Sequence, residues 1–234
     1  MSLVVVLIGG YLIFAAVWFD TRPKDIACTA IEWDIRDSVD YHFVTEQELN
    51  TLIHHTNLSP ENKPVEQVLT QAIEACVQSH PMVRQAQCYI TRTGRVIVHL
   101  TQRVPLLGVR TENASYYIDS DRLRMPLHSL EKADVIWATG NVEESLAKKE
   151  LADIVVWLQN QSRWEGRFER MDVKDKENIT LIDTTGLKVR VGDGSGFESK
   201  MHKLHVFEVQ MANVEGKEYK ELDLRYKDQV IGRE

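Results

Sequence analysis

Cysteine is scarce in this sequence, and clusters of metal-binding residues are missing. The chain of 234 residues has three cysteines, Cys28, Cys76 and Cys88, and none belongs to a C-x-x-C motif. This number and spacing exclude a readable disulfide framework and a zinc site of the usual kind. Cys76 and Cys88 fall on apolar faces of predicted elements, so we interpret them as small buried hydrophobic residues.

Catalytic motifs are missing as well. No G-x-S-x-G motif is present to expose a nucleophilic serine. Gly192, Gly194 and Gly196 resemble a phosphate-binding loop, but without the P-loop Lys-Ser/Thr pair or G-x-G-x-x-G spacing we interpret them as a turn leading into a helix. His202 and His205 share a helix face, yet spacing ties no third ligand to them. We therefore predict a protein that is not an enzyme and has no cofactor or metal.

Positive charge is in the minority. The chain has 28 Lys and Arg residues against 35 Asp and Glu residues, and its net charge is −7. A nucleic-acid-binding surface needs clustered Lys and Arg to displace counterions from phosphates. The charge balance therefore argues against a nucleic-acid partner.

An uncharged apolar run occupies residues 3–19 near the N-terminus. As a helix this run is about 26 Å long, slightly less than the ~30 Å hydrocarbon core of a membrane. We predict a transmembrane helix and juxtamembrane segment over residues 1–26, with Trp18 and Phe19 at the membrane interface. A cleaved signal peptide is the alternative, but no basic residue precedes the run and residues 15–17 form a poor cleavage site.

The charges that flank this run bear on its orientation. Arg22 and Lys24 follow the run, where Asp20 and Asp25 offset them. By the positive-inside rule, the two basic residues alone favour a cytoplasmic globular part.

The next part of the chain has the pattern of a strand, two helices and two strands. Apolar residues alternate with polar ones over residues 31–35, which predicts a half-buried strand. Thr45 and Glu48 form a capping box for a short helix, and apolar spacing predicts a second helix over residues 65–77. Two strands follow, at residues 86–90 and 96–100, joined by a turn at Thr93-Gly94. We expect both helices on one face of a small sheet.

The second half is richer in strands. We predict strands at residues 116–118, 135–138, 168–173, 179–182 and 187–191, with residues 183–186 as a tight turn. Asn141 with Glu144 predicts the cap of a helix whose apolar stripe is Ala147, Leu151, Ile154, Val155 and Leu158, and a second helix covers residues 197–211. Leu222, Leu224 and Tyr226 alternate with polar residues, which predicts a terminal strand within residues 219–230. The fold class is therefore α+β, with a domain boundary near Val104-Pro105.

Several motifs resemble known families. The segments His80-Pro81-Met82-Val83 and Gln102-Arg103-Val104-Pro105 resemble the second half of a polypeptide-transport-associated (POTRA) domain. The segments Tyr116-Tyr117-Ile118-Asp119, Met125-Pro126-Leu127 and Leu222-Asp223-Leu224-Arg225-Tyr226 resemble the strand motifs of the FtsQ/DivIB bacterial cell-division family. The chain departs from the family pattern at Ser120-Asp121-Arg122-Leu123, where a glycine is usual. The turn there must be built differently.

The resemblance implies three parts: an anchor over residues 1–26, a POTRA domain over 27–103 and an FtsQ-type β domain over 104–234, the last rich in strands with flanking helices. It implies a non-enzymatic bitopic scaffold of the divisome, a single-pass protein of the cell inner membrane whose globular part is periplasmic. Such a scaffold links early and late division proteins in septum formation, binding FtsB and FtsL and meeting other divisome proteins through its POTRA domain. The alternative is a POTRA-bearing transport or outer-membrane assembly factor. That class usually has several POTRA modules or a C-terminal barrel.

The resemblance also indicates a partner-binding segment. In the family the C-terminal strand receives a segment of FtsB, and the matching positions here are Arg225, Tyr226 and Asp228, with Leu224 and Tyr219 as supporting residues. A strand at a sheet edge offers unpaired N–H and C=O groups to a second chain. We expect Tyr226 to be the aromatic anchor of this contact, because aromatic residues dominate interface energetics. The alternative is that Tyr226 belongs to the core of its own sheet.

Overall fold

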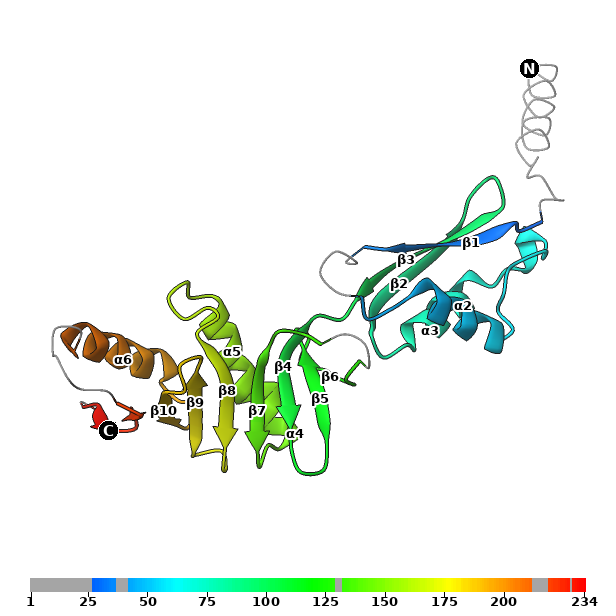
Figure 1. Ribbon diagram of the computed structural model, residues 1–234. Helices are drawn as coiled ribbons and strands as arrows, with labels where there is room; N and C mark the ends of the chain where they lie inside the picture. The colour runs from blue at the N-terminus through cyan, green and yellow to red at the C-terminus, as the bar shows by residue number, and fades with distance from the viewer. Residues whose placement is uncertain (1–26, 37–41, 129–131, 212–218, 228) are drawn as a thin grey trace, which may run out of the picture. The chain divides into compact units, whose positions relative to one another are not determined.

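The computed structural model of the chain (Figure 1) describes residues 27–36, 42–128, 132–211, 219–227 and 229–234. The predicted anchor, residues 1–26, lies outside the described residues. Within the described ranges, no helix is both long and apolar enough to cross a membrane. These ranges form two compact units. The first comprises residues 27–36 and 44–101, and the second comprises residues 42–43 and those from 102 onwards.

A small sheet and two helices form the first unit. Its elements in chain order are β1 (Ala30–Ile35), α2 (Glu46–His55), the 3₁₀ turn η1 (Val65–Gln67), α3 (Thr70–Gln78), β2 (Val83–Ile90) and β3 (Arg95–Gln102). The sheet order is β1-β3-β2, and β1 is parallel to β3. Both helices lie on one face of the sheet (Figure 1). The predicted order of strand, two helices and two strands is confirmed.

Helix α2 begins at the predicted capping box. The backbone N–H of Glu48 donates to Thr45 Oγ1 at 3.2 Å, and the Thr45 N–H donates to Glu48 Oε2 at 3.0 Å. These reciprocal bonds satisfy donors that have no partner within the first turn of a helix. Leu49 and Ile53 are then buried, which fixes the face of the helix that meets the sheet.

The second helix is shorter than predicted. The expected helix over residues 65–77 is broken, because Val68 is extended with φ −80° and ψ 118°, and α3 begins only at Thr70. Leu69 is 64% exposed, so it contributes nothing to the buried stripe. Val65, Val68 and Leu69 match helical spacing by sequence alone, but only the later residues Ile73 and Val77 are buried against the sheet.

The cysteines are free thiols in different environments. Cys28 and Cys88 are buried, and the Cys28 thiol donates to the Gly94 carbonyl at 3.1 Å. Burial raises the pKa of the Cys88 thiol to about 12, with a further contribution from the charge of Glu74. The prediction that Cys76 is buried is wrong, because this residue is partly exposed, with its sulfur 3.4 Å from Thr56 Oγ1.

The second unit is a long mixed sheet covered by helices. Its strands are β4 (Pro105–Arg110), β5 (Ser115–Asp119), β6 (Arg124–Met125), β7 (Ile136–Gly140), β8 (Phe168–Val173), β9 (Ile179–Asp183), β10 (Lys188–Gly192), β11 (Glu221–Asp223) and β12 (Ile231–Arg233). Among the described residues the sheet order is β12-β11-β10-β9-β8-β7-β4-β5-β6. The predicted meander is confirmed: β9 is antiparallel to β8 and to β10.

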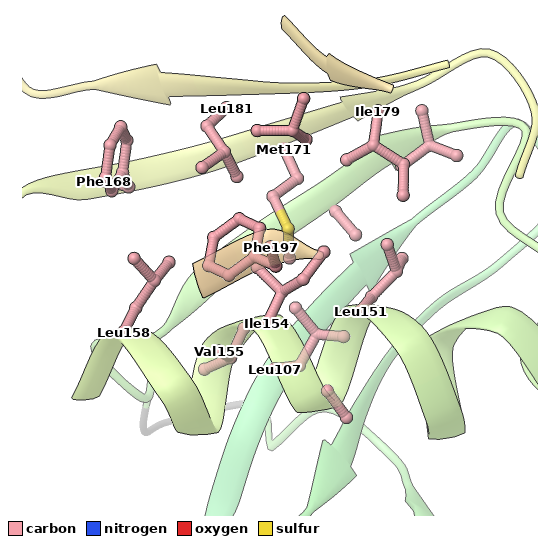
Figure 2. Close-up of a cluster of buried hydrophobic side chains, with 14 of the residues drawn as sticks. Leu107, Leu151, Ile154, Val155, Leu158, Phe168, Met171, Ile179, Leu181 and Phe197 are labelled. Atoms are coloured by element: carbon pink, nitrogen blue, oxygen red, sulfur yellow. The ribbon is translucent and has the colours of Figure 1, made fainter. Parts of the chain in front are cut away.

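The helices of this unit share one core with one face of the sheet. They are α4 (Glu144–Leu146), a π-helical turn η2 (Ala147–Leu151), α5 (Ala152–Gln159) and α6 (Phe197–Met211). Figure 2 shows Leu151, Ile154 and Leu158 pointing from the helices towards Met171 and Leu181 of the strands. Phe197 of α6 joins the same cluster. The predicted apolar stripe over residues 147–158 is therefore confirmed as the buried face.

The predicted cap of this helical segment is wrong. The helix begins at Glu144, its N-cap is Glu143, and no side chain caps it. The Glu144 carboxylate instead accepts from Arg124 at 3.2 Å and pairs with Lys148 at 2.5 Å. The hydrogen bond from Lys148 is the main reason why the pKa of Glu144 lies below its usual value. The Asn141 N–H donates to the Val173 carbonyl at 2.9 Å instead.

The turn between β5 and β6 shows how this chain replaces the usual glycine. Arg122 has a φ of +65°, the left-handed region that favours glycine. The buried carboxylate of Asp119 accepts from the Leu123 N–H at 2.7 Å and from Arg103 Nη1 at 2.6 Å, which fixes both ends of the turn. The Arg122 guanidinium donates to Asp153 Oδ1 of α5 at 2.7 Å. The surrounding contacts thus hold a non-glycine residue in an unfavourable backbone conformation.

We expect Arg122→Gly to be more stable than Arg122→Ala by about 1 kcal/mol, because only alanine keeps a Cβ in the left-handed region. Both variants lose the ion pair with Asp153, so the difference between their unfolding free energies reports the backbone conformation at residue 122. Urea unfolding of the two full-length variants measures it. Equal unfolding free energies would mean that the turn stores no strain.

Candidate functional site

The C-terminal segment does not form the single strand predicted within residues 219–230. Strand β11 covers Glu221–Asp223 and pairs parallel with β10, and the chain then returns as β12, Ile231–Arg233, antiparallel to β11. The alternation of Leu222, Leu224 and Tyr226 continues past the end of the strand, so alternation alone placed its boundary wrongly. Strand β12 is the last in the sheet order, which leaves its outer side as an edge among the described residues.

Pairing with β10 ends at Leu224. Its N–H still donates to the Arg190 carbonyl at 2.9 Å, and its side chain is fully buried in the core that the helices cover. Leu224 therefore supports the segment from within the domain, and its side chain is not on the surface.

The next residue, Arg225, folds back onto Asp223. Arg225 Nε donates to Asp223 Oδ1 at 2.9 Å and Nη2 donates to Oδ2 at 2.7 Å, a bidentate pair, while the Arg225 N–H also donates to Oδ1 at 3.1 Å. Asp223 is buried, and the hydrogen bond from Arg225 is the main reason why its pKa is lowered. The same bond raises the pKa of Arg225. The backbone then bends at the next two residues, Tyr226 and Lys227.

Gly192 makes room for this arrangement. It has a φ of +75° at the end of β10, and a Cβ there would approach Arg225 Cγ to 2.9 Å. A side chain at this position would therefore be strained and would push Arg225 away from Asp223. Gly192 belongs to the turn before α6, as the sequence predicted.

Tyr226 lies at the surface. Its side chain is 45% exposed, so the alternative that it belongs to the core is wrong. Its carbonyl accepts a hydrogen bond from Lys203 Nζ, and the same ammonium group donates to the Leu224 carbonyl at 2.9 Å. Asp228, the third predicted contact, lies outside the described residues.

Tyr219 lies beneath the edge strand. Its ring packs against Phe207 of α6 with centroids 5.5 Å apart, and its hydroxyl group donates to Met211 Sδ at 3.9 Å. The ring also covers Gly232, where a Cβ would collide with it. Tyr219 therefore fills the space that a side chain on β12 would otherwise occupy.

No pattern in the sequence indicated β12 itself. Three residues with a central glycine are too short for a periodic signal. Ile231 is partly exposed, and Arg233 Nη1 donates to Glu221 Oε1 at 3.0 Å, beside a longer bond from Arg190 Nη1 at 3.4 Å. Both arginines face the uncovered side of the sheet, so this edge carries a fixed group of charges.

A metal site has no basis in the described residues. No group of three or more His, Cys, Asp or Glu side chains among them could hold an ion. His202 and His205 lie on α6, where His202 is exposed. The arrangement at the C-terminal edge supports binding through backbone groups and side-chain anchors.

Comparison with known families gives two matches. A POTRA-like domain matches residues 26–101, and a domain described as FtsQ/DivIB, C-terminal related, matches residues 104–233. The chain belongs to the FtsQ/DivIB family. FtsQ/DivIB membership, which the sequence motifs predicted, is thereby confirmed and indicates a role in cell division. No curated protein matched the sequence.

We expect Asp223→Asn to lower the unfolding free energy of this FtsQ/DivIB protein by about 1.5–3 kcal/mol at pH 7, because a buried bond to a charged partner is lost. The contribution of Asp223 is complete above its unfolded-state pKa of about 3.9 and is lost as the pH falls through the lower folded-state pKa. The difference between wild type and variant should therefore shrink below about pH 4. Urea unfolding from about pH 2.5 to about pH 7, on both sides of that pKa, measures this difference.

Asp153→Asn is the matched control. It also breaks an Arg–Asp contact of 2.7 Å, but its side chain is 72% exposed. It should cost less than about 1 kcal/mol. Equal losses from both substitutions would contradict the structural role given to Asp223.

Proposed function

We propose that this chain is a non-enzymatic scaffold of the bacterial divisome that receives a strand of FtsB at the outer edge of β12. The observation that carries the proposal is the edge itself: β12 ends the sheet, and the exposed Tyr226 lies in the loop that precedes it. FtsL joins through the same complex, and the POTRA-like unit contacts other division proteins. Residues 1–26 anchor the chain in the inner membrane, with both folded units in the periplasm.

Strand addition suits this edge for a physical reason. An edge strand presents N–H and C=O groups that water or another chain must satisfy. Because β12 has only three residues, Ile231–Arg233, its backbone offers few hydrogen bonds to a partner. Side-chain anchors must then supply much of the affinity, and Tyr226 is the large aromatic side chain next to this edge.

Residues next to Tyr226 and β12 hold the edge in a fixed conformation. Arg225 is held by Asp223, and its side chain is still 34% exposed, so it can meet a partner without moving far. Tyr219 supports β12 from the side that the helices cover. A rigid site loses less conformational freedom on binding than a flexible one.

We expect Tyr226→Ala to abolish copurification of FtsB with the full-length chain, since truncation of an interface anchor commonly costs ~2 kcal/mol or more. The thermal unfolding midpoint should change little, because the side chain is 45% exposed. Tyr89→Ala is the matched control, since Tyr89 is 44% exposed but lies on β2 of the first unit. FtsB that copurifies equally with both variants would remove Tyr226 from the site.

We expect cells depleted of the protein to form filaments with incomplete septa, and a reporter fused after Glu234 to be active only in the periplasm. Microscopy of depleted cells and the activity of paired periplasmic and cytoplasmic reporters measure these outcomes. Normal division with reduced outer-membrane protein levels would instead favour the assembly-factor alternative. A cytoplasmic reporter signal would contradict the proposed topology.

A further inference from the structure

Lys203 connects α6 to the segment that bears Tyr226. It lies in the middle of α6, and its ammonium group donates to the carbonyl oxygens of Leu224 and Tyr226. Those two carbonyls belong to alternate residues at the point where β11 has ended. Both bonds come from a charged donor, and such bonds are stronger than those between neutral groups.

Contacts on both faces of the sheet therefore hold residues 224–226 in place. Asp223 is in register with Arg190, on the face opposite the described helices, and there it binds Arg225. Lys203 reaches the same segment from α6, on the covered face, where Leu224 is buried. Arg225 is thus held by its side chain, and the residues on either side of it by their carbonyl groups. The contact with Asp223 and the bonds from Lys203 thus act on the same three residues from opposite sides.

We propose that Lys203 is a positioning residue, which holds residues 224–226 in the conformation that presents Tyr226 to a partner strand. Its effect on affinity rests on the proposed function, whereas its effect on the segment does not. A binding site that adopts its competent conformation only part of the time binds its partner more weakly by that fraction. By keeping the segment in place, Lys203 prevents this loss of affinity.

A second lysine on the same helix provides a matched control. Lys200 Nζ also donates to two oxygens, the Asp193 carbonyl at 2.9 Å and Asp193 Oδ1 at 2.8 Å. These contacts lie at the start of α6, next to Gly192, and neither oxygen belongs to residues 224–226. Lys200→Met therefore removes the same kind of interaction from the same helix and leaves residues 224–226 in contact with Lys203.

The test compares the full-length wild type with Lys203→Met, Lys203→Arg and Lys200→Met. Hydrogen exchange of backbone amides reports local opening of each segment. We expect Lys203→Met to speed exchange in residues 225–227 and 229–233 about tenfold, to leave β8 and β9 unchanged, and to weaken FtsB binding about tenfold. Lys203→Arg should restore most of both properties, because it keeps a charged donor, and Lys200→Met should affect neither.

Two results would overturn the proposal. One is unchanged exchange in the C-terminal segment of Lys203→Met. The other is faster exchange with no loss of FtsB binding, while Tyr226→Ala still abolishes binding. If the wild type itself failed to bind FtsB, the proposed function would fall, and the exchange comparison would still decide whether Lys203 holds the segment.

Discussion

The contact between Asp223 and Arg225 determines where the sheet of the second unit ends. Pairing with β10 continues through Leu224, whose N–H donates to the Arg190 carbonyl; the bidentate bond then holds Arg225 against Asp223, and the chain bends at Tyr226 and Lys227. The chain must return, and it does so as β12, which becomes the outermost strand. Gly192 permits this geometry because a side chain there would displace Arg225. The identity of the edge strand, and hence the place where another chain could add, follows from this local pair.

The described helices cover one face of this sheet, so its two faces have different roles. The covered face holds a continuous apolar core, to which α5 and α6 contribute (Figure 2). The uncovered face is polar near the C-terminus, where Glu221 is shared between Arg190 and Arg233. Met201 and Leu204 of α6 are buried in this core, so the helix that carries Lys203 is firmly packed. Lys203 on one face and the Asp223–Arg225 pair on the other thus connect the surface segment to the folded domain.

Local patterns were predictable from the sequence, whereas features set by distant contacts were not. The capping box at Thr45 and the stripe facing the sheet in α5 depend on neighbours a few residues apart, and both are confirmed. The break at Val68, the charged partners of Glu144 and the return strand β12 depend on which residues tertiary packing buries or pairs. At the site, Tyr226 was located by family resemblance. Lys203 lies 23 residues from Tyr226 in sequence, and no spacing rule connects them.

The burial of Cys88 has a consequence for redox chemistry. Burial raises the thiol pKa of Cys88 to about 12, which disfavours the thiolate, and the thiolate is the form that attacks disulfides. Cys28, also buried, has a thiol pKa raised by the same cause and donates to a backbone carbonyl. The fold itself therefore protects these two thiols from disulfide exchange. Disulfide exchange at either thiol therefore requires local opening of the POTRA-like unit.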